Sequence, residues 1–174
     1  EAGVRWVELD VKLTADDVAI LMHDDRLDRT TDRRGPVRGT TWVQLAGADA
    51  GAWFGDAFAG TPIPRLDTVL ATLRRLGLGL NLEIKSCPGR GPATAAVAAR
   101  TLAAADFPVD QVVVTSFDWS AIAWLAARAP TWPRGLLTAR LDAPWARTAA
   151  KLGCVSVHVG EPALLRAGIA AIHD

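Results

Sequence analysis

Short apolar runs alternate with segments of helical periodicity along most of this chain. Runs at period two or in continuous blocks predict strands, and apolar residues three or four apart predict helices. The expected strands are 4–13, 18–22, 78–84, 111–117, 134–138 and 155–159. The expected helices are a short one near 42–45, one that begins at Leu66 and is capped by Gly77, and 93–105, 119–128, 145–151 and 163–173. This alternation indicates parallel βα units, and without a Gly-x-Gly-x-x-Gly turn it favours a TIM-type barrel over a dinucleotide-binding sheet.

Residues 24–62 interrupt the alternation. They are rich in Asp, Arg, Thr and Gly, and only the piece near Trp42 has a helical pattern. A loop of this length inside a compact domain is usually functional. We therefore expect one α/β domain over residues 1–174, with an insertion at about 24–62.

The composition excludes several classes of protein. Nineteen basic and 19 acidic residues give a formal net charge of zero, which argues against nucleic acid or an anionic membrane as a partner bound through bulk charge. No apolar run approaches the roughly 18 residues of a membrane helix, so we expect no stable membrane insertion. The only cysteines, Cys87 and Cys154, are too few for a disulfide-rich secreted scaffold and are compatible with a reducing compartment.

Acidic side chains lie inside two of the apolar strands. Glu8 and Asp10 share one face of the first strand, and Glu83 and Lys85 share one face of another, because side chains alternate along a strand. In a barrel the opposite face packs on helices, so these charged faces are expected to point into the barrel. Buried charges are costly unless they are paired or bind a metal. Three carboxylates from two strands would make a hard oxygen site, suited to Mg²⁺ or Ca²⁺.

A histidine and a lysine extend this candidate site. His23 ends the next strand, and a histidine above the carboxyl end of a barrel strand is placed for general acid–base chemistry. Lys85 would supply a fixed positive charge for an anion such as phosphate. An alternative needs no ligand: Glu83 with Lys85, or Asp10 with Lys12, would form ordinary ion pairs, and the histidine would lie in a capped turn. The pattern of residues alone leaves both interpretations open.

Several longer motifs occur in a fixed order along the chain. They are Glu8-Leu9-Asp10-Val11-Lys12-Leu13-Thr14, His23-Asp24-Asp25-Arg26-Leu27-Asp28-Arg29-Thr30-Thr31, Pro62-Ile63-Pro64-Arg65-Leu66, Asn81-Leu82-Glu83-Ile84-Lys85, Thr115-Ser116-Phe117, Pro133-Arg134-Gly135-Leu136-Leu137 and Leu152-Gly153-Cys154-Val155-Ser156-Val157-His158. In order and spacing they resemble the glycerophosphodiester phosphodiesterases, and the last two resemble the short cytoplasmic bacterial branch. The resemblance covers essentially the whole chain.

The resemblance implies a cytoplasmic enzyme of phospholipid-derived glycerol metabolism. It implies a TIM barrel that hydrolyses glycerophosphodiesters to glycerol 3-phosphate and an alcohol, with Mg²⁺ or Ca²⁺ held by Glu8, Asp10 and Glu83. It makes His23 one of two catalytic histidines and Lys85 a phosphate-site residue. In the mechanism proposed for the family, the substrate's own glycerol hydroxyl attacks phosphorus while the histidines transfer protons.

The chain also departs from the family pattern. The family's first strand ends in His-Arg-Gly and supplies the other catalytic histidine, but this motif is absent here. The family's last strands carry Trp-Thr-Val-Asn and Thr-Asp, and this chain stops before them at Asp174. The chain starts at Glu1 and its only methionine is Met22, whereas a barrel of this type typically has about 250 residues. We therefore expect an incomplete barrel that lacks the first strand and the C-terminal strand region, with little or no turnover by itself.

Two other functions are compatible with these residues. An inactive fragment or degenerate barrel would bind metal or phosphate without turnover. Another phosphodiesterase on the same barrel, such as a phospholipase-like enzyme, is less favoured because the chain has no apolar docking segment. The sequence contains no pattern that specifies the alcohol headgroup or the oligomeric state.

The remaining candidate residues have weaker signals. Phe117 is expected to bind substrate by forming a wall of the glycerol pocket, with core packing as an equal alternative. His158 and Cys87 are expected to be lining or packing residues. The arginines of the insertion are expected to pair with neighbouring acidic residues rather than to bind phosphate; they are Arg26, Arg29, Arg33, Arg34 and Arg38.

Overall fold

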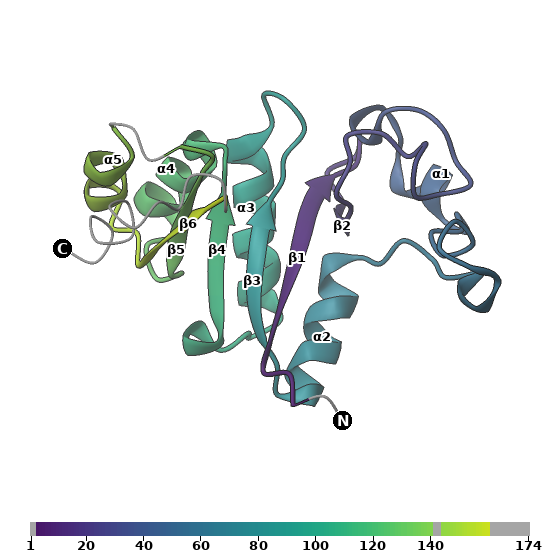
Figure 1. The fold of residues 1–174 in the computed structure, drawn as a ribbon, viewed down its shortest axis with the longest axis horizontal. Coiled ribbons are helices and arrows are strands. Elements are labelled where there is room, and N and C mark those ends of the chain that lie inside the picture. The colour runs from purple at the N-terminus through teal and green to yellow at the C-terminus, as the bar shows by residue number, and fades with distance from the viewer. Residues whose placement is uncertain (1–2, 141–143, 161–174) are drawn as a thin grey trace.

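The structure, a computed structural model, describes residues 3–140 and 144–160 and contains one six-stranded sheet (Figure 1). The strand order is β2-β1-β3-β4-β5-β6. The strands are β1 (Trp6–Leu13), β2 (Ala19–Leu21), β3 (Gly79–Ile84), β4 (Val112–Ser116), β5 (Arg134–Thr138) and β6 (Ser156–Val159). All neighbouring pairs are parallel except β1 with β2. The predicted α/β class is confirmed, and the parallel sheet is consistent with an incomplete TIM-type barrel.

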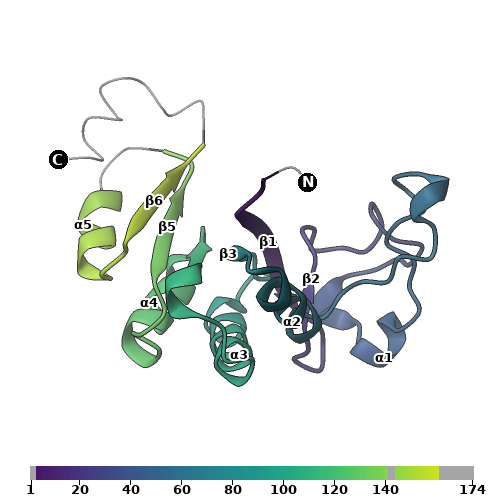
Figure 2. The same cartoon turned by 90° about the horizontal axis from the view of Figure 1, so that it is seen from below.

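Four helices lie along one face of the sheet (Figure 2). They are α2 (Leu66–Leu76), α3 (Gly91–Ala104), α4 (Trp119–Arg128) and α5 (Trp145–Lys151). The main core lies between them and the sheet, where Val11, Leu82 and Val114 are fully buried. The alternate strand positions face away from these helices and carry polar groups, among them Asn81 and Thr115, which are joined by a hydrogen bond of 2.9 Å. The sheet therefore presents a polar face opposite its helical layer.

Helix α2 shows how local sequence sets these elements. Its apolar residues Leu66, Leu70 and Leu73 recur at helical spacing and are buried against the sheet. The helix ends at Gly77, whose φ of 64° lies in the left-handed region that glycine adopts without strain. The predicted cap is confirmed. The predicted bounds of α4, β5 and α5 are also those observed, whereas the predicted helix at 163–173 lies outside the described residues.

Strand β2 differs from the parallel series that the sequence suggested. It has three residues and pairs antiparallel with β1, with Val11 opposite Leu21 and Leu13 opposite Ala19. Only residues 14–18 separate the two strands, whereas a parallel connection needs a crossover of a dozen or more residues. The chain therefore turns back along β1 and does not continue the barrel order at this point.

The segment predicted as an insertion forms short elements around a small second core, which it shares with residues on and beside β2 and with Cys87. It contains the one-turn helix α1 (Trp42–Leu45) and the 3₁₀ turns Val37–Gly39 and Asp56–Phe58. Outside this segment, one more 3₁₀ turn, Val109–Gln111, precedes β4. The small core lies under these turns and comprises Ile20, Met22, Leu27, Val37, Leu45, Ala48, Ile63 and Cys87. This packing places the segment beside β1 and β2 (Figure 1).

One turn of this segment is organised by a single carboxylate. Asp49 accepts hydrogen bonds from the backbone N–H groups of Gly51 (2.8 Å), Ala52 (3.0 Å) and Gly60 (2.8 Å). These bonds favour the charged form and lower the pKa of Asp49 from its ordinary value. The turn is also closely packed, because a Cβ at Gly51 would lie 1.9 Å from the carbonyl oxygen of Phe58.

None of the helices in residues 3–140 and 144–160 is both long enough and apolar enough to cross a membrane.

The packing at Gly51 gives a stability prediction. Gly51→Ala is expected to lower the free energy of unfolding by about 1–3 kcal/mol, because its methyl group would overlap the backbone of Phe58 and force it to shift. Gly55→Ala is the matched control, since its Cβ would approach only the ring of Phe58, at 4.0 Å. Chemical denaturation measures both, and equal effects of the two substitutions would contradict this account of the turn.

Candidate functional site

Three carboxylates meet on the polar face of the sheet. Glu8 and Asp10 lie on β1, and Glu83 lies on the adjacent strand β3. The parallel register places Asp10 directly opposite Glu83. One carboxylate oxygen from each of the three residues lies within 4.8 Å of the others. The structure thus brings together the three residues that the sequence analysis selected as metal ligands; we call them the acidic cluster.

The acidic cluster is partly withdrawn from solvent. The side chains of Asp10 and Glu83 are 17% and 12% exposed. Burial, followed by the negative charges of Asp10 and Glu83, raises the pKa of Glu8 above its ordinary value. Oδ1 of Asp10 is buried and has no hydrogen-bond partner among the described residues. Converging carboxylate oxygens, one of them buried without a donor, fit a hard divalent cation such as Mg²⁺ or Ca²⁺.

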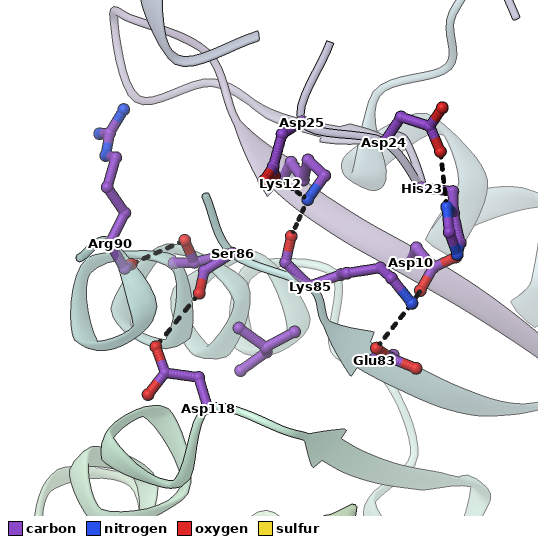
Figure 3. Close-up of polar contacts among 12 residues, drawn as sticks. Asp10, Lys12, His23, Asp24, Asp25, Glu83, Lys85, Ser86, Arg90 and Asp118 are labelled. Atoms are coloured by element: carbon purple, nitrogen blue, oxygen red, sulfur yellow. Dashed lines mark hydrogen bonds and ion pairs between the residues drawn. The ribbon is translucent and has the colours of Figure 1, made fainter. Parts of the chain in front are cut away.

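Lys85 lies at the edge of the acidic cluster. Its Nζ is 3.1 Å from Oε1 of Glu83 and 3.5 Å from Oδ1 of Asp10 (Figure 3). Burial favours the neutral amine, but the hydrogen bond to Glu83 and the charges of both carboxylates outweigh it and raise the pKa of Lys85. The lysine therefore stays an ammonium and offsets part of the negative charge.

A second lysine, Lys12, contacts Lys85. It was not predicted from the sequence as part of the site. The buried Lys12 donates hydrogen bonds to Oδ1 of Asp25 (2.8 Å) and to the backbone carbonyl of Lys85 (Figure 3). The alternative pairing of Lys12 with Asp10 is wrong, because Asp25 returns beside the end of β1 after the β1–β2 turn. Lys12 continues the period-two spacing of Glu8 and Asp10, and this spacing is the signal in the sequence that could have placed Lys12 in the site.

His23 lies beside Asp10 and lines the pocket at the carboxyl ends of β1 and β3 together with Lys12 and Lys85. The antiparallel direction of β2 explains this position: the chain runs back along β1, and the N–H of Met22 donates to the carbonyl of Asp10 at 3.0 Å. The side chain of His23 is 59% exposed, and its Nδ1 is 2.7 Å from Oδ1 of Asp24. Figure 3 shows the ring between Asp24 and Asp10.

Three pockets lined by described residues lie at or beside the acidic cluster. One of about 360 Å³ is lined by Glu8, Asp10 and His23 and by the insertion residues Arg29 and Trp53. A second, of about 500 Å³, lies between His23, Lys12 and Lys85 and also contacts Asp24, Asp25, Arg26 and Ser86. A ligand that contacts the cluster can therefore extend in more than one direction.

The third pocket, of about 370 Å³, contains Phe117. It is also lined by Glu83, Lys85, Ser86, Pro88 and Asp118. Phe117 is 53% exposed, so it is not a core residue. Ser86 donates a long hydrogen bond of 3.3 Å to Asp118, which caps helix α4. The apolar ring thus lies beside the charged groups of the site.

The other candidates make packing or polar contacts in the described part of the chain. Cys87 is buried in the small core, and burial raises the pKa of its thiol. His158 is half-buried, its Nε2 lies 2.9 Å from Oγ of Ser156, and burial lowers its pKa. Four insertion arginines lie within 4.0 Å of insertion aspartates, as expected: Arg26, Arg29, Arg33 and Arg34.

Comparisons with known proteins place this chain in a family. The model of the glycerophosphoryl diester phosphodiesterase family matches residues 1–174. A glycerophosphodiester phosphodiesterase of Caldanaerobacter subterraneus is 32% identical over 91% of this chain, which spans 65% of that protein. YhdW of Bacillus subtilis is 44% identical over 48% of the chain, which spans 34% of its length. The chain thus spans between about a third and two thirds of these relatives.

A solved structure has the same arrangement of elements. It is that of an Oleispira antarctica phosphodiesterase in complex with the product sn-glycerol-3-phosphate. Its TM-score is 0.93 at 31% identity, and the match covers 98% of this chain and 69% of that one. With a family model that matches the whole chain, these similarities confirm the resemblance found in the motifs. The chain belongs to the glycerophosphoryl diester phosphodiesterase family.

Proposed function

We propose that the intact protein hydrolyses glycerophosphodiesters to glycerol 3-phosphate and an alcohol. The observation that carries the proposal is the acidic cluster with Lys85 and His23 at its edges, in a chain of this family. The product held by the Oleispira relative supports the same chemistry. Within that protein, we propose that residues 1–174 form a partial barrel domain with its insertion at about 24–62.

Glu8, Asp10 and Glu83 would hold a divalent cation, Mg²⁺ or Ca²⁺. When bound, the ion supplies Lewis-acid polarisation and offsets the charge of the phosphate. Oδ1 of Asp10, which has no hydrogen-bond partner among the described residues, and the raised pKa of Glu8 support this proposal, because both are costs that a cation would remove.

Lys85 is proposed to bind a phosphate oxygen. Its ammonium is held at the border between the acidic cluster and the pocket that contains Phe117. From there it can donate to a phosphate oxygen while the ring of Phe117 packs against the glycerol carbons. A charged donor to phosphate makes one of the stronger hydrogen bonds in proteins.

His23 is proposed to transfer a proton at Nε2. Its Nδ1 is bonded to the carboxylate of Asp24, which only accepts, so Nδ1 carries a proton and Nε2 is the nitrogen left for the reaction. A cytoplasmic location remains a prediction, based on the resemblance to the short bacterial branch and on the two free cysteines.

Loss of a cluster carboxylate is expected to abolish hydrolysis. Glu83→Ala in the intact protein should reduce release of glycerol 3-phosphate from glycerophosphocholine by at least about 100-fold, since the chemistry of a bound ion is worth several kcal/mol. Chelation of divalent cations should have the same effect on the unaltered protein. The control is Asp110→Asn, which lies just before β4, at the end of that strand opposite to Phe117, and should retain activity. Turnover by metal-free Glu83→Ala protein would refute the proposal.

The raised pKa of Glu8 gives a pH-dependent prediction for the metal-free chain. A raised carboxyl pKa contributes stability below the unfolded value, and this contribution is lost as pH rises through the folded pKa. At neutral pH, Glu8→Gln is therefore expected to raise the Tm of the metal-free chain. The variant should also lose the increase in Tm that cation causes, about 5–10 °C at 100 times Kd for the unaltered chain.

Thermal unfolding across pH 4 to 8, with and without Mg²⁺ or Ca²⁺, measures both effects. Glu161 lies outside the described residues, so Asp110→Asn again serves as the matched carboxylate control. A Glu8→Gln chain that is less stable than the unaltered chain without metal would show that Glu8 is not a repelling charge. A Glu8→Gln chain that keeps the full increase in Tm would show that Glu8 is not a ligand.

Removal of the Lys85 ammonium is expected to weaken phosphate binding. Lys85→Met should raise the Kd for glycerol 3-phosphate by about 10- to 100-fold, the value of one hydrogen bond between charged groups. Titration calorimetry in the presence of Mg²⁺ makes the measurement. Lys151→Met removes an exposed lysine at the end of α5 and should leave the Kd unchanged. Equal Kd values for both variants would exclude Lys85 from the phosphate site.

A further inference from the structure

His23 is the first of four side chains in contact that lead from the acidic cluster into the insertion. Its Nδ1 is 2.7 Å from Oδ1 of Asp24. Asp24 accepts two hydrogen bonds from Arg29, from Nε at 2.6 Å and from Nη2 at 2.8 Å. The guanidinium carbon of Arg29 is in turn 5.9 Å from the ring centroid of Trp53. Three of the four, His23, Arg29 and Trp53, line the same pocket as Glu8 and Asp10.

The ion pair between Asp24 and Arg29 has a geometry that fixes the relative orientation of the two side chains. The two guanidinium nitrogens meet the two carboxylate oxygens in parallel, an arrangement that specifies orientation as well as charge. The side chain of Asp24 is 25% exposed, well below the 57% of Arg29. Hydrogen bonds from Arg29 and then from His23 hold the pKa of Asp24 far below its ordinary value, so it remains a carboxylate.

His23 itself has little packing to fix its ring. Its side chain is 59% exposed, so rotation about χ2 is not restricted by a surrounding core. The bond to Asp24 is the one hydrogen bond that its ring makes within the described residues. The orientation of the ring therefore depends on the orientation of Asp24, and Asp24 is oriented by Arg29.

We infer that Arg29 is a positioning residue for His23. By holding both oxygens of Asp24, it keeps one of them as the acceptor for Nδ1–H, so that Nε2 is directed to the pocket shared with the acidic cluster. Trp53 supports the guanidinium from the insertion side. The catalytic consequence rests on the proposed function, because it requires His23 to transfer a proton. The effect of Arg29 on the orientation of the His23 ring does not rest on that function.

The same segment offers a matched control. Arg33 pairs with Asp32 at 3.6 Å, and its side chain is 48% exposed. It lines none of the three pockets at the acidic cluster. It resembles Arg29 in residue type, partner and exposure, but its partner does not contact His23. Arg29→Gln and Arg33→Gln thus each remove one exposed ion pair from the insertion, and only the first should affect the histidine.

The ring nitrogens of His23 report the effect directly. In the 174-residue chain with Mg²⁺, at a pH where the ring is neutral, ¹⁵N shifts of His23 should indicate the form protonated at Nδ1. Arg29→Gln should shift the population toward the form protonated at Nε2, and Arg29→Lys should have a smaller effect because it keeps the charge without the second bond. Arg33→Gln should leave the shifts unchanged. Identical shifts in all four proteins would overturn the inference.

Kinetics of the intact protein provide the second measurement. Arg29→Gln is expected to lower kcat by about 10-fold, part of the contribution of a positioned proton donor, with little change in KM. A merely structural role would instead lower Tm and the active fraction, without a change in the ring nitrogens. Changed ¹⁵N shifts with no turnover in any variant would support the positioning role while refuting the proposed function. Unchanged shifts with normal turnover would refute only the positioning role.

Discussion

The repulsion among three closely placed carboxylates is the constraint on which the site depends. The parallel register of β1 and β3 fixes Asp10 opposite Glu83 and brings Glu8 within reach of both. The core on the other face of these strands, around Val11 and Leu82, holds that register, so the charges cannot separate without disturbing the sheet. Lys85 offsets part of the charge. The fold thus maintains an arrangement that is costly without a cation, which is typical of a site built for function.

Two short-range features arrange the rest of the site around this cluster. The antiparallel turn from β1 to β2 brings His23 beside Asp10, and the bond between the buried Lys12 and Asp25 ties the following segment to the end of β1. The insertion then contributes Arg29 and Trp53 to the pocket that His23 shares with the cluster. Sheet and insertion therefore act together: one holds the carboxylates, and the other orients the group proposed to transfer protons.

Periodicity predicted the parts of this structure that depend on neighbours in sequence. Alternation in two strands was enough to place Glu8, Asp10 and Glu83 on one polar face, and helical spacing located α2 and its cap. The direction of β2 was missed, although its five-residue connection to β1 is too short for a parallel crossover. The partners of Lys12 and Arg29 could not be predicted, because they depend on how a loop folds back in three dimensions. The exposure of Phe117 could not be predicted either, because it depends on where β4 ends.

The most direct test of the central claim is a crystal structure of the chain grown with Mn²⁺, whose anomalous scattering identifies the ion. The account predicts one anomalous peak on the polar face, with oxygens of Glu8, Asp10 and Glu83 at about 2.0–2.6 Å from it. Oδ1 of Asp10, which has no hydrogen-bond partner within residues 3–140 and 144–160, should be among the ligands. The account would be contradicted if no peak appeared there and the three carboxylates kept only Lys85 as their partner.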